Sequence, residues 1–103
     1  MSAEPAGYSS DAAAATARRI VKICNQKGLH ARAAARFVKT AYQFDAEIWV
    51  KKNGTVVSGR SIMGLMMLAA ASGTELQIAA AGPDADSAVE TLACLVECKF
   101  DEE

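Results

Sequence analysis

The most reactive residue in this sequence is His30, the only histidine, which lies in the segment Gly28-Leu29-His30-Ala31-Arg32. A β-prone run ends just before this segment and helical spacing follows it, so we expect the imidazole at the start of a helix. A helix N-terminus presents unpaired backbone N–H groups and roughly half a positive charge, and it therefore suits a phosphate. The same dipole disfavours the imidazolium ion and so favours the neutral, nucleophilic imidazole.

Two neighbours of His30 suit the same chemistry. Arg32 is near enough in sequence to add a charge-assisted hydrogen bond to phosphoryl oxygens. Gly28 allows the chain to turn tightly into the helix. A lone histidine near a helix start is also an ordinary cap or surface residue, so the residue types alone leave both interpretations open.

The three cysteines, Cys24, Cys94 and Cys98, form no disulfide framework of the kind that small secreted proteins use. Cys94 and Cys98 are four residues apart on a predicted helix and would share one of its faces. Because the chain has one histidine and no Cys-x-x-Cys pair, we expect no metal site. We interpret Cys94 and Cys98 as small, buried apolar residues.

The apolar spacing predicts seven elements in the order β-α-β-β-α-β-α. The predicted strands cover residues 18–24, 46–52, 55–58 and 75–81, and the helices cover 30–42, 61–71 and a last segment with Asp84 as its N-cap. Ser61 is the predicted N-cap of the second helix. We therefore expect an α+β fold, an open-faced β-sandwich with a four-stranded antiparallel sheet covered on one face by three helices.

Asn53-Gly54 lies between two β-prone runs and predicts a hairpin with a two-residue type I′ turn. Pairing outward from this turn opposes Val50 to Val57 and Lys51 to Val56. The resulting faces are Ile48, Val50 and Val57 on one side, and Trp49 and Val56 on the other. We expect Trp49 to lie exposed on the uncovered face of the sheet.

Helical spacing also predicts which side chains are buried. The expected core positions are Ala34, Phe37, Val38 and Ala41 in the first helix, Ile62, Leu65, Met66 and Ala69 in the second, and Ala88, Leu92, Leu95 and Val96 in the last. The second helix is apolar around most of its surface, so it has more apolar residues than a single buried face can accommodate. We therefore expect Met63, Met67 and Leu68 to form part of a docking surface for partner proteins.

Composition limits the classes of function. The net charge is -1, so no bulk attraction to nucleic acid is expected. No apolar stretch reaches the roughly 18 residues of a membrane-spanning helix, and the N-terminus lacks the features of a secretory signal, so we expect a cytoplasmic protein with reduced thiols. Residues 1–17 are rich in Ala, Ser, Gly and Pro and are interpreted as a mobile extension, followed by one domain at 18–103.

The segment around His30 resembles the active-site motif of the HPr family, the histidine-containing phosphocarriers of the phosphoenolpyruvate-dependent phosphotransferase system. Further similarity lies in Phe37-Val38-Lys39, Asn53-Gly54, Gly73-Thr74 and the second signature of the family, Arg60-Ser61-Ile62-Met63-Gly64-Leu65-Met66. One departure is Ala33, where the family usually has proline. Proline would fix φ and remove an amide donor, so Ala33 retains a donor but loosens the helix entry.

The resemblance implies a carrier, not an enzyme in its own right. Phosphorylated enzyme I would pass its phosphoryl group to Nδ1 of His30, the ring nitrogen expected to face solvent. Arg32 and the amides of Ala31, Arg32 and Ala33 would hold the group until it passes to an enzyme IIA-type acceptor. The resemblance implies no cofactor, a monomer, and Arg60 as a further docking residue.

The second signature also resembles a regulatory phosphorylation site at Ser61, modified by an HPr serine kinase/phosphorylase. The alternative function is therefore an interaction module controlled at Ser61 rather than through His30. The stretch from Ile62 to Leu68 resembles carriers of the nitrogen-related regulatory branch, which stands beside sugar uptake as a possible pathway. An unrelated small enzyme or RNA-binding module would need paired catalytic carboxylates or a basic aromatic face, and we find neither.

Overall fold

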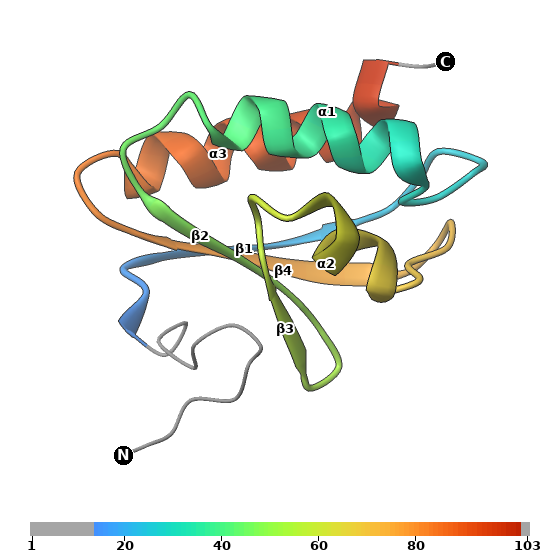
Figure 1. Ribbon diagram of the computed structural model, residues 1–103, viewed down its shortest axis with the longest axis horizontal. Helices are drawn as coiled ribbons and strands as arrows, with labels where there is room; N and C mark the ends of the chain where they lie inside the picture. The colour runs from blue at the N-terminus through green and yellow to red at the C-terminus, as the bar shows by residue number, and fades with distance from the viewer. Residues whose placement is uncertain (1–13, 102–103) are drawn as a thin grey trace.

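The computed structural model describes residues 14–101 and confirms the predicted α+β class (Figure 1). Its elements are β1 Ala17–Lys22, α1 Ala31–Ala41, β2 Glu47–Lys52, β3 Thr55–Ser58, α2 Ile62–Met67, β4 Glu75–Ala81, α3 Ala85–Glu97 and a 3₁₀ turn, η2 Lys99–Asp101. The strands form one four-stranded antiparallel sheet in the order β1-β4-β2-β3. Within residues 14–101, no helix is both long and apolar enough to cross a lipid bilayer.

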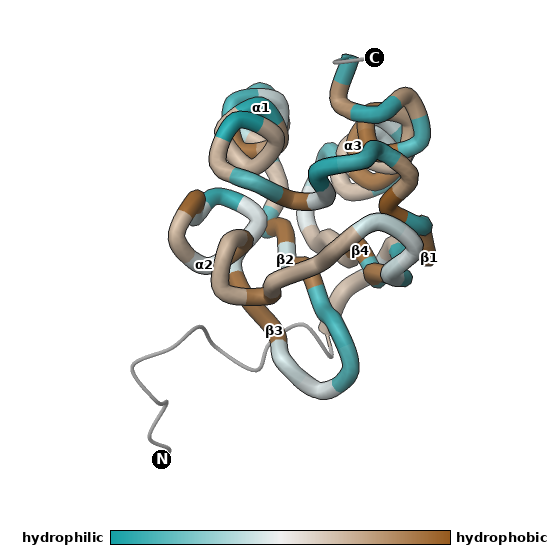
Figure 2. The backbone as a smooth tube through the Cα atoms, turned by 90° about the vertical axis from the view of Figure 1, so that its right-hand side faces the viewer, coloured by the Kyte–Doolittle hydropathy of each residue, from teal (hydrophilic) through white to brown (hydrophobic). Residues whose placement is uncertain are grey.

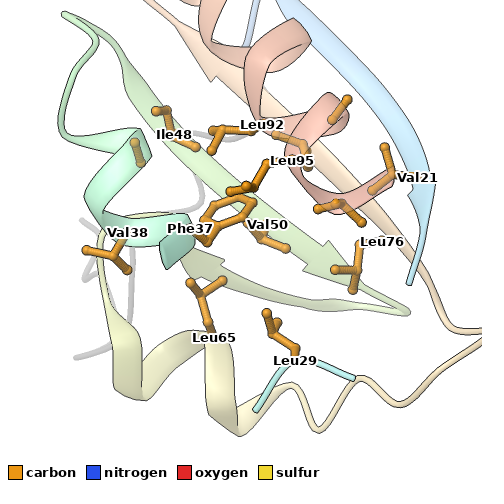
Figure 3. Packing of buried hydrophobic residues seen from close by; sticks show 14 of the residues in the cluster. Val21, Leu29, Phe37, Val38, Ile48, Val50, Leu65, Leu76, Leu92 and Leu95 are labelled. Carbon is orange, nitrogen blue, oxygen red and sulfur yellow. The ribbon is translucent and has the colours of Figure 1, made fainter. Parts of the chain in front are cut away.

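The main core lies between the sheet and its helices. Figure 2 shows α1 and α3 side by side above the sheet, with α2 below α1 near β3. The ring of Phe37 from α1 points towards Val50 and Leu95, with Leu65 of α2 close by (Figure 3). Every core position predicted for the first and last helices is buried. The helical spacing of their apolar residues was therefore sufficient to identify the packed faces.

The β2–β3 hairpin has the predicted register, with Val50 opposite Val57 and Lys51 opposite Val56. The turn class was predicted wrongly. Asn53 has a φ of 52°, whereas Gly54 lies outside the left-handed region, and a type I′ turn requires positive φ at both positions. The register is nevertheless as predicted, because it is set by the apolar face that the two strands share. This register leaves two residues in the connection.

Trp49 is buried, and the prediction of an exposed indole was wrong. Its side chain is only 3% exposed and packs in a second, smaller cluster with Ala15 and Ala79. The chain crosses this face before β1 begins, where the amide of Thr16 donates to the carbonyl of Ala80 at 2.9 Å. Ordered structure thus begins earlier than residue 18, and the rest of the proposed extension lies outside the described residues.

Helix α2 ends at Met67, earlier than the predicted end at residue 71. Ala69 leaves the helical conformation with a φ of 51°. The ammonium group of Lys52 donates to the carbonyls of Leu68 (2.8 Å) and Ala69 (3.3 Å) and so caps the end of this helix. The early end frees the carbonyl of Ala70 to accept from the amide of Leu29 at 2.9 Å, beside His30.

The shortening of α2 changes which of its residues are buried. Leu65 faces the core as predicted, but Ile62 and Met66 are about two-fifths exposed and Ala69 is exposed. Leu68, predicted as a docking residue, is instead buried in the core. A helix of this length offers the core little more than one turn, so Leu65 and the capping residue Leu68 fill the space.

The C-terminal end contains a feature that the sequence did not indicate. Lys99, Phe100 and Asp101 all have positive φ values, 58°, 55° and 61°. Three consecutive left-handed residues are unfavourable for L-amino acids. The turn is retained because it places the Phe100 ring, fully buried, in the main core.

Candidate functional site

The loop that carries His30 is fixed by Gly28. This residue has a φ of 67°, and a Cβ placed on it would lie 2.5 Å from the carbonyl oxygen of Ala70 and 2.9 Å from Cα of Ala71. Only glycine therefore fits, both in conformation and in space. The buried side chain of Leu29, and the hydrogen bond from its backbone N–H to the Ala70 carbonyl, then anchor the residue next to His30 to the chain that follows α2.

Asn25 supports this loop from inside, and sequence reasoning missed it. Its side chain is fully buried, and Nδ2 donates to the Gly28 carbonyl at 2.9 Å. The Gly28 amide in turn donates to the Asn25 carbonyl at 3.2 Å. Asparagine side chains commonly form hydrogen bonds to the nearby backbone in turns, so an asparagine three residues before a glycine could have indicated this contact. The turn is thus closed by hydrogen bonds in both directions.

His30 is the N-cap of α1, with extended backbone angles and a partly buried side chain. Its Nδ1 lies 3.0 Å from the Gly28 carbonyl oxygen, the same atom that accepts from Asn25. A carbonyl only accepts, so this contact places the proton of a neutral imidazole on Nδ1 and the lone pair on Nε2. Nδ1, which was expected to face solvent, thus contacts a backbone carbonyl in this conformation.

The first turn of α1 leaves its N-terminal amides without an acidic side chain from the helix itself. The His30 side chain makes no capping hydrogen bond. The amide of Ala34 donates to the His30 carbonyl at 2.8 Å. The amides of Ala31, Arg32 and Ala33 precede that bond, where a helix has no carbonyl of its own to offer. These are the amides predicted to hold a phosphoryl group.

Arg32 and Ala33 occupy different environments beside these amides. Arg32 is exposed, and its guanidinium has no ion pair or hydrogen bond to any residue in the described part of the chain. Ala33 is fully buried in the core, so its side chain secures the first turn of α1 by packing. Ala33 thus provides both a packed side chain and a backbone donor.

Ser61 has its predicted structural role. Its Oγ accepts from the amide of Gly64 at 2.9 Å, which caps α2. The neighbouring Arg60 is engaged within the fold, because its Nη2 donates to the Phe44 carbonyl at 2.7 Å and its guanidinium lies 5.0 Å from the centre of the Tyr42 ring. Arg60 therefore ties the end of α1 to the start of α2.

The outer surface of α2 is strongly apolar. Met63 and Met67 are 71% and 75% exposed. Ile62 and Met66 lie beside them, partly exposed. The chain that follows this helix contacts the His30 loop through the Ala70 carbonyl, so the apolar surface and the candidate site belong to connected segments.

The cysteines do not behave as predicted. All three are free and exposed, whereas buried side chains were expected at Cys94 and Cys98. Cys24 follows the edge strand β1, and Cys94 and Cys98 lie outside the stripe of buried residues on α3. Among residues 14–101, no cluster of three or more His, Cys, Asp and Glu side chains is arranged to hold a metal ion.

Comparison with known proteins gives a consistent result. Residues 17–97 match the family model described as the PTS HPr component phosphorylation site. The phosphocarrier protein HPr of Neisseria meningitidis serogroup A is 47% identical over 85 residues, 82% of this chain and 96% of that protein. The phosphocarrier protein NPr of Shewanella violacea is 43% identical, with 82% and 92% covered.

A solved structure agrees with these sequence matches. The crystal structure of HPr-C-His from Thermoanaerobacter tengcongensis superimposes with a TM-score of 0.82 at 42% identity, and the match covers 85% of this chain and 99% of that one. The similarity spans both the site around His30 and the elements that position it. The chain therefore belongs to the HPr family of phosphocarrier proteins.

Proposed function

We propose that this protein accepts a phosphoryl group on His30 from phosphorylated enzyme I and donates it to an enzyme IIA-type acceptor. The observation that carries this proposal is the open N-terminus of α1, which begins at His30 without an acidic residue or a side-chain cap. Free amides and the positive end of the dipole favour an anion at this position. Arg32 adds an exposed guanidinium two residues along the chain, with no ion pair to a residue between 14 and 101.

The transfer is an exchange of one P–N bond for another. A lone pair on the His30 ring attacks phosphorus while the P–N bond of the enzyme I phosphohistidine breaks, and the reverse exchange later loads the acceptor. Attack by Nδ1, which family resemblance favours, requires the neutral tautomer that carries its proton on Nε2, reached by exchange with solvent, and loss of the contact between Nδ1 and the Gly28 carbonyl. The ring must therefore turn before transfer, and the Asn25 bond holds the carbonyl in place while it does so.

The phosphoryl group is bound covalently and passed on, so the protein acts as a carrier and not as a catalyst. Its stabilisation comes from backbone amides and a guanidinium, and no bound cofactor is required. The partner enzymes supply most of the transition-state stabilisation, because a carrier that bound its phosphoryl group tightly would not release it.

The exposed apolar surface of α2, formed by Ile62, Met63, Met66 and Met67, is proposed as the docking surface. Methionine side chains adapt to differently shaped partners, and this carrier must bind its donor and its acceptor in turn. Leu68 is excluded from this surface because it is buried. Arg60 is proposed to act at its edge, held in position by Tyr42 and Phe44.

Labelling with radioactive phosphoenolpyruvate and enzyme I tests the proposal. We expect an acid-labile, base-stable phosphate on the wild type and none on His30→Ala, which removes the only histidine. Ser61→Ala is the matched control, because it removes a hydroxyl at the start of α2 but leaves the imidazole, and it should label normally. No label on the wild type, or equal label on His30→Ala, would contradict the proposal.

A second candidate function is regulation at Ser61 by an HPr serine kinase/phosphorylase. The supporting observation is that Ser61 Oγ lies at the N-terminus of α2, beside the proposed docking surface. A phosphate there would favour the helix but place about -1.5 to -2 charge among apolar contacts. If control ran through this serine alone, Ser61→Ala would abolish signalling while His30→Ala would leave it intact.

The proposed pathway is the nitrogen-related regulatory branch, with the chain acting as a cytoplasmic monomer. The apolar run of α2 supports this branch, and a relative named NPr is 43% identical. Phosphorylated protein should transfer its group faster to a nitrogen-related enzyme IIA than to a sugar-specific one. Faster transfer to the sugar-specific acceptor would place the carrier in sugar uptake instead.

A further inference from the structure

The side chain of Lys52 joins the end of β2 to the end of α2. Its Nζ donates to the carbonyls of Leu68 at 2.8 Å and Ala69 at 3.3 Å, and the side chain is partly buried. The last carbonyls of a helix have no partner within the helix, and the negative end of the helix dipole favours an ammonium group beside them. Lys52 therefore fixes the point at which the chain leaves α2.

This end of α2 leads directly to the loop that carries His30. Ala69 leaves the helical conformation with a φ of 51°. The next residue, Ala70, is buried, and its carbonyl accepts from the amide of Leu29 at 2.9 Å. The same carbonyl oxygen stands against Gly28, where a Cβ would lie 2.5 Å from it. A displacement of Ala70 would therefore be passed on to the two residues directly before His30.

The Gly28 carbonyl in turn orients the imidazole. Its oxygen lies 3.0 Å from Nδ1 of His30, and Nδ2 of Asn25 donates to it at 2.9 Å. A continuous series of contacts thus runs from the ammonium group of Lys52 to the ring of the nucleophile. We propose that Lys52 is a positioning residue for phosphoryl transfer at His30 and acts through the Ala70 carbonyl, an inference that rests on the proposed function.

The segment that contains Ala70 has a second anchor at its other end. The amide of Gly73 donates to the Ile23 carbonyl at 2.7 Å, and the amide of Ile23 donates to the Thr74 carbonyl at 2.8 Å. These bonds hold the end of the segment next to β4, whereas Lys52 holds the end next to α2. Loss of the Lys52 bonds should therefore loosen the His30 loop while the protein remains folded.

Kinetics of the full-length protein, with phosphorylated enzyme I as the donor, test the proposal. Lys52→Met keeps the length of the side chain but removes its donors. It should lower kcat by roughly three- to tenfold, because the nucleophile is misplaced. KM should change by less than about twofold, because the exposed methionines of α2 remain. Lys52→Arg retains donors and should recover most of the lost rate.

Lys51→Met is the matched control. Lys51 is the neighbouring residue on β2, and its exposed side chain points to the opposite face of the sheet. Its replacement changes the net charge by the same amount as Lys52→Met but leaves the end of α2 capped. Both kcat and KM should stay at the wild-type values in this variant.

Two NMR readouts test the positioning without any transfer. Hydrogen exchange of the Leu29 amide should accelerate by at least about threefold in Lys52→Met, because its bond to Ala70 is loosened. The amide of Gly59, which donates to the Ile48 carbonyl at 2.8 Å, should exchange at the wild-type rate. The ¹⁵N signal of His30 Nδ1 should also shift, because its contact with Gly28 changes. If the wild type were not phosphorylated at all, the proposed function would fail, and these signals would still decide the role of Lys52.

Three results would overturn this inference. The first is an unshifted His30 ring signal or a wild-type kcat in Lys52→Met. The second is a loss confined to KM, which would assign Lys52 to partner docking. The third is an equal loss of rate in Lys51→Met, which would make the effect a general consequence of the lost charge.

Discussion

Substitution of Gly28 by alanine should disturb the His30 loop through two separable effects. A left-handed residue with a Cβ is less stable by about 1–2 kcal/mol, and the φ of Gly28 is 67°. The new methyl group would also lie 2.5 Å from the Ala70 carbonyl oxygen, and side chains forced into occupied space cost about 1–3 kcal/mol. Reduced freedom of the unfolded chain offsets about 0.4–1 kcal/mol. The net loss of unfolding free energy should be about 1–4.6 kcal/mol, with a midpoint near 3 kcal/mol.

Two other glycines separate these effects. Gly73→Ala has a φ of 92° but open space around its Cβ, so it should cost about 1 kcal/mol from conformation alone. Gly54→Ala has neither feature and should stay within about 0.5 kcal/mol of the wild type. Urea unfolding followed by the fluorescence of Trp49, the single, buried tryptophan, measures all three. Equal effects at Gly28 and Gly73 would refute the steric part, and no loss at Gly28 would refute the whole explanation.

Three further substitutions test other parts of the structure by the same unfolding assay. Ser61→Ala removes the cap of α2 and should reduce the unfolding free energy by about 1 kcal/mol, and no change would show that the bond to Gly64 is unimportant. Leu68→Ala should lower the unfolding free energy by about 2–5 kcal/mol, because this side chain is buried. Met67→Ala changes an exposed side chain and should lower it by less than about 0.5 kcal/mol. A larger loss for Met67→Ala than for Leu68→Ala would contradict the burial of Leu68. Asn25→Ala removes a buried hydrogen bond and should lower the unfolding free energy by about 1–3 kcal/mol. It should also broaden the NMR signals of the His30 ring, because the loop loses its internal support. Sharp signals in this variant would show that Asn25 does not position the loop.

The main elements and the candidate nucleophile were predictable because each rests on a local signal. Helical spacing identified the packed faces of α1 and α3, and alternation from Asn53-Gly54 set the hairpin register. His30 was placed correctly at the start of a helix because Gly28 and the change of period both mark that boundary. Ser61 was recognised as a cap by its residue type and position alone.

The features that the sequence did not reveal depend on residues distant in the chain. Helix α2 ends early because Lys52, sixteen residues before Leu68, caps its carbonyls. Trp49 is buried because the segment before β1 crosses its face of the sheet. The bond from Nδ1 of His30 to the Gly28 carbonyl depends on loop geometry that residue types do not specify. Long-range contacts of this kind override local propensity.

The central claim is that a phosphoryl group on His30 is held by the amides at the start of α1. Amide NMR spectra of the protein before and after phosphorylation by enzyme I test it most directly. We predict large downfield shifts for the amides of Ala31, Arg32 and Ala33, because they become hydrogen-bonded to the group, and unchanged signals at the distant Gly54 turn. Phosphorylation that left those three amides unshifted would contradict this account.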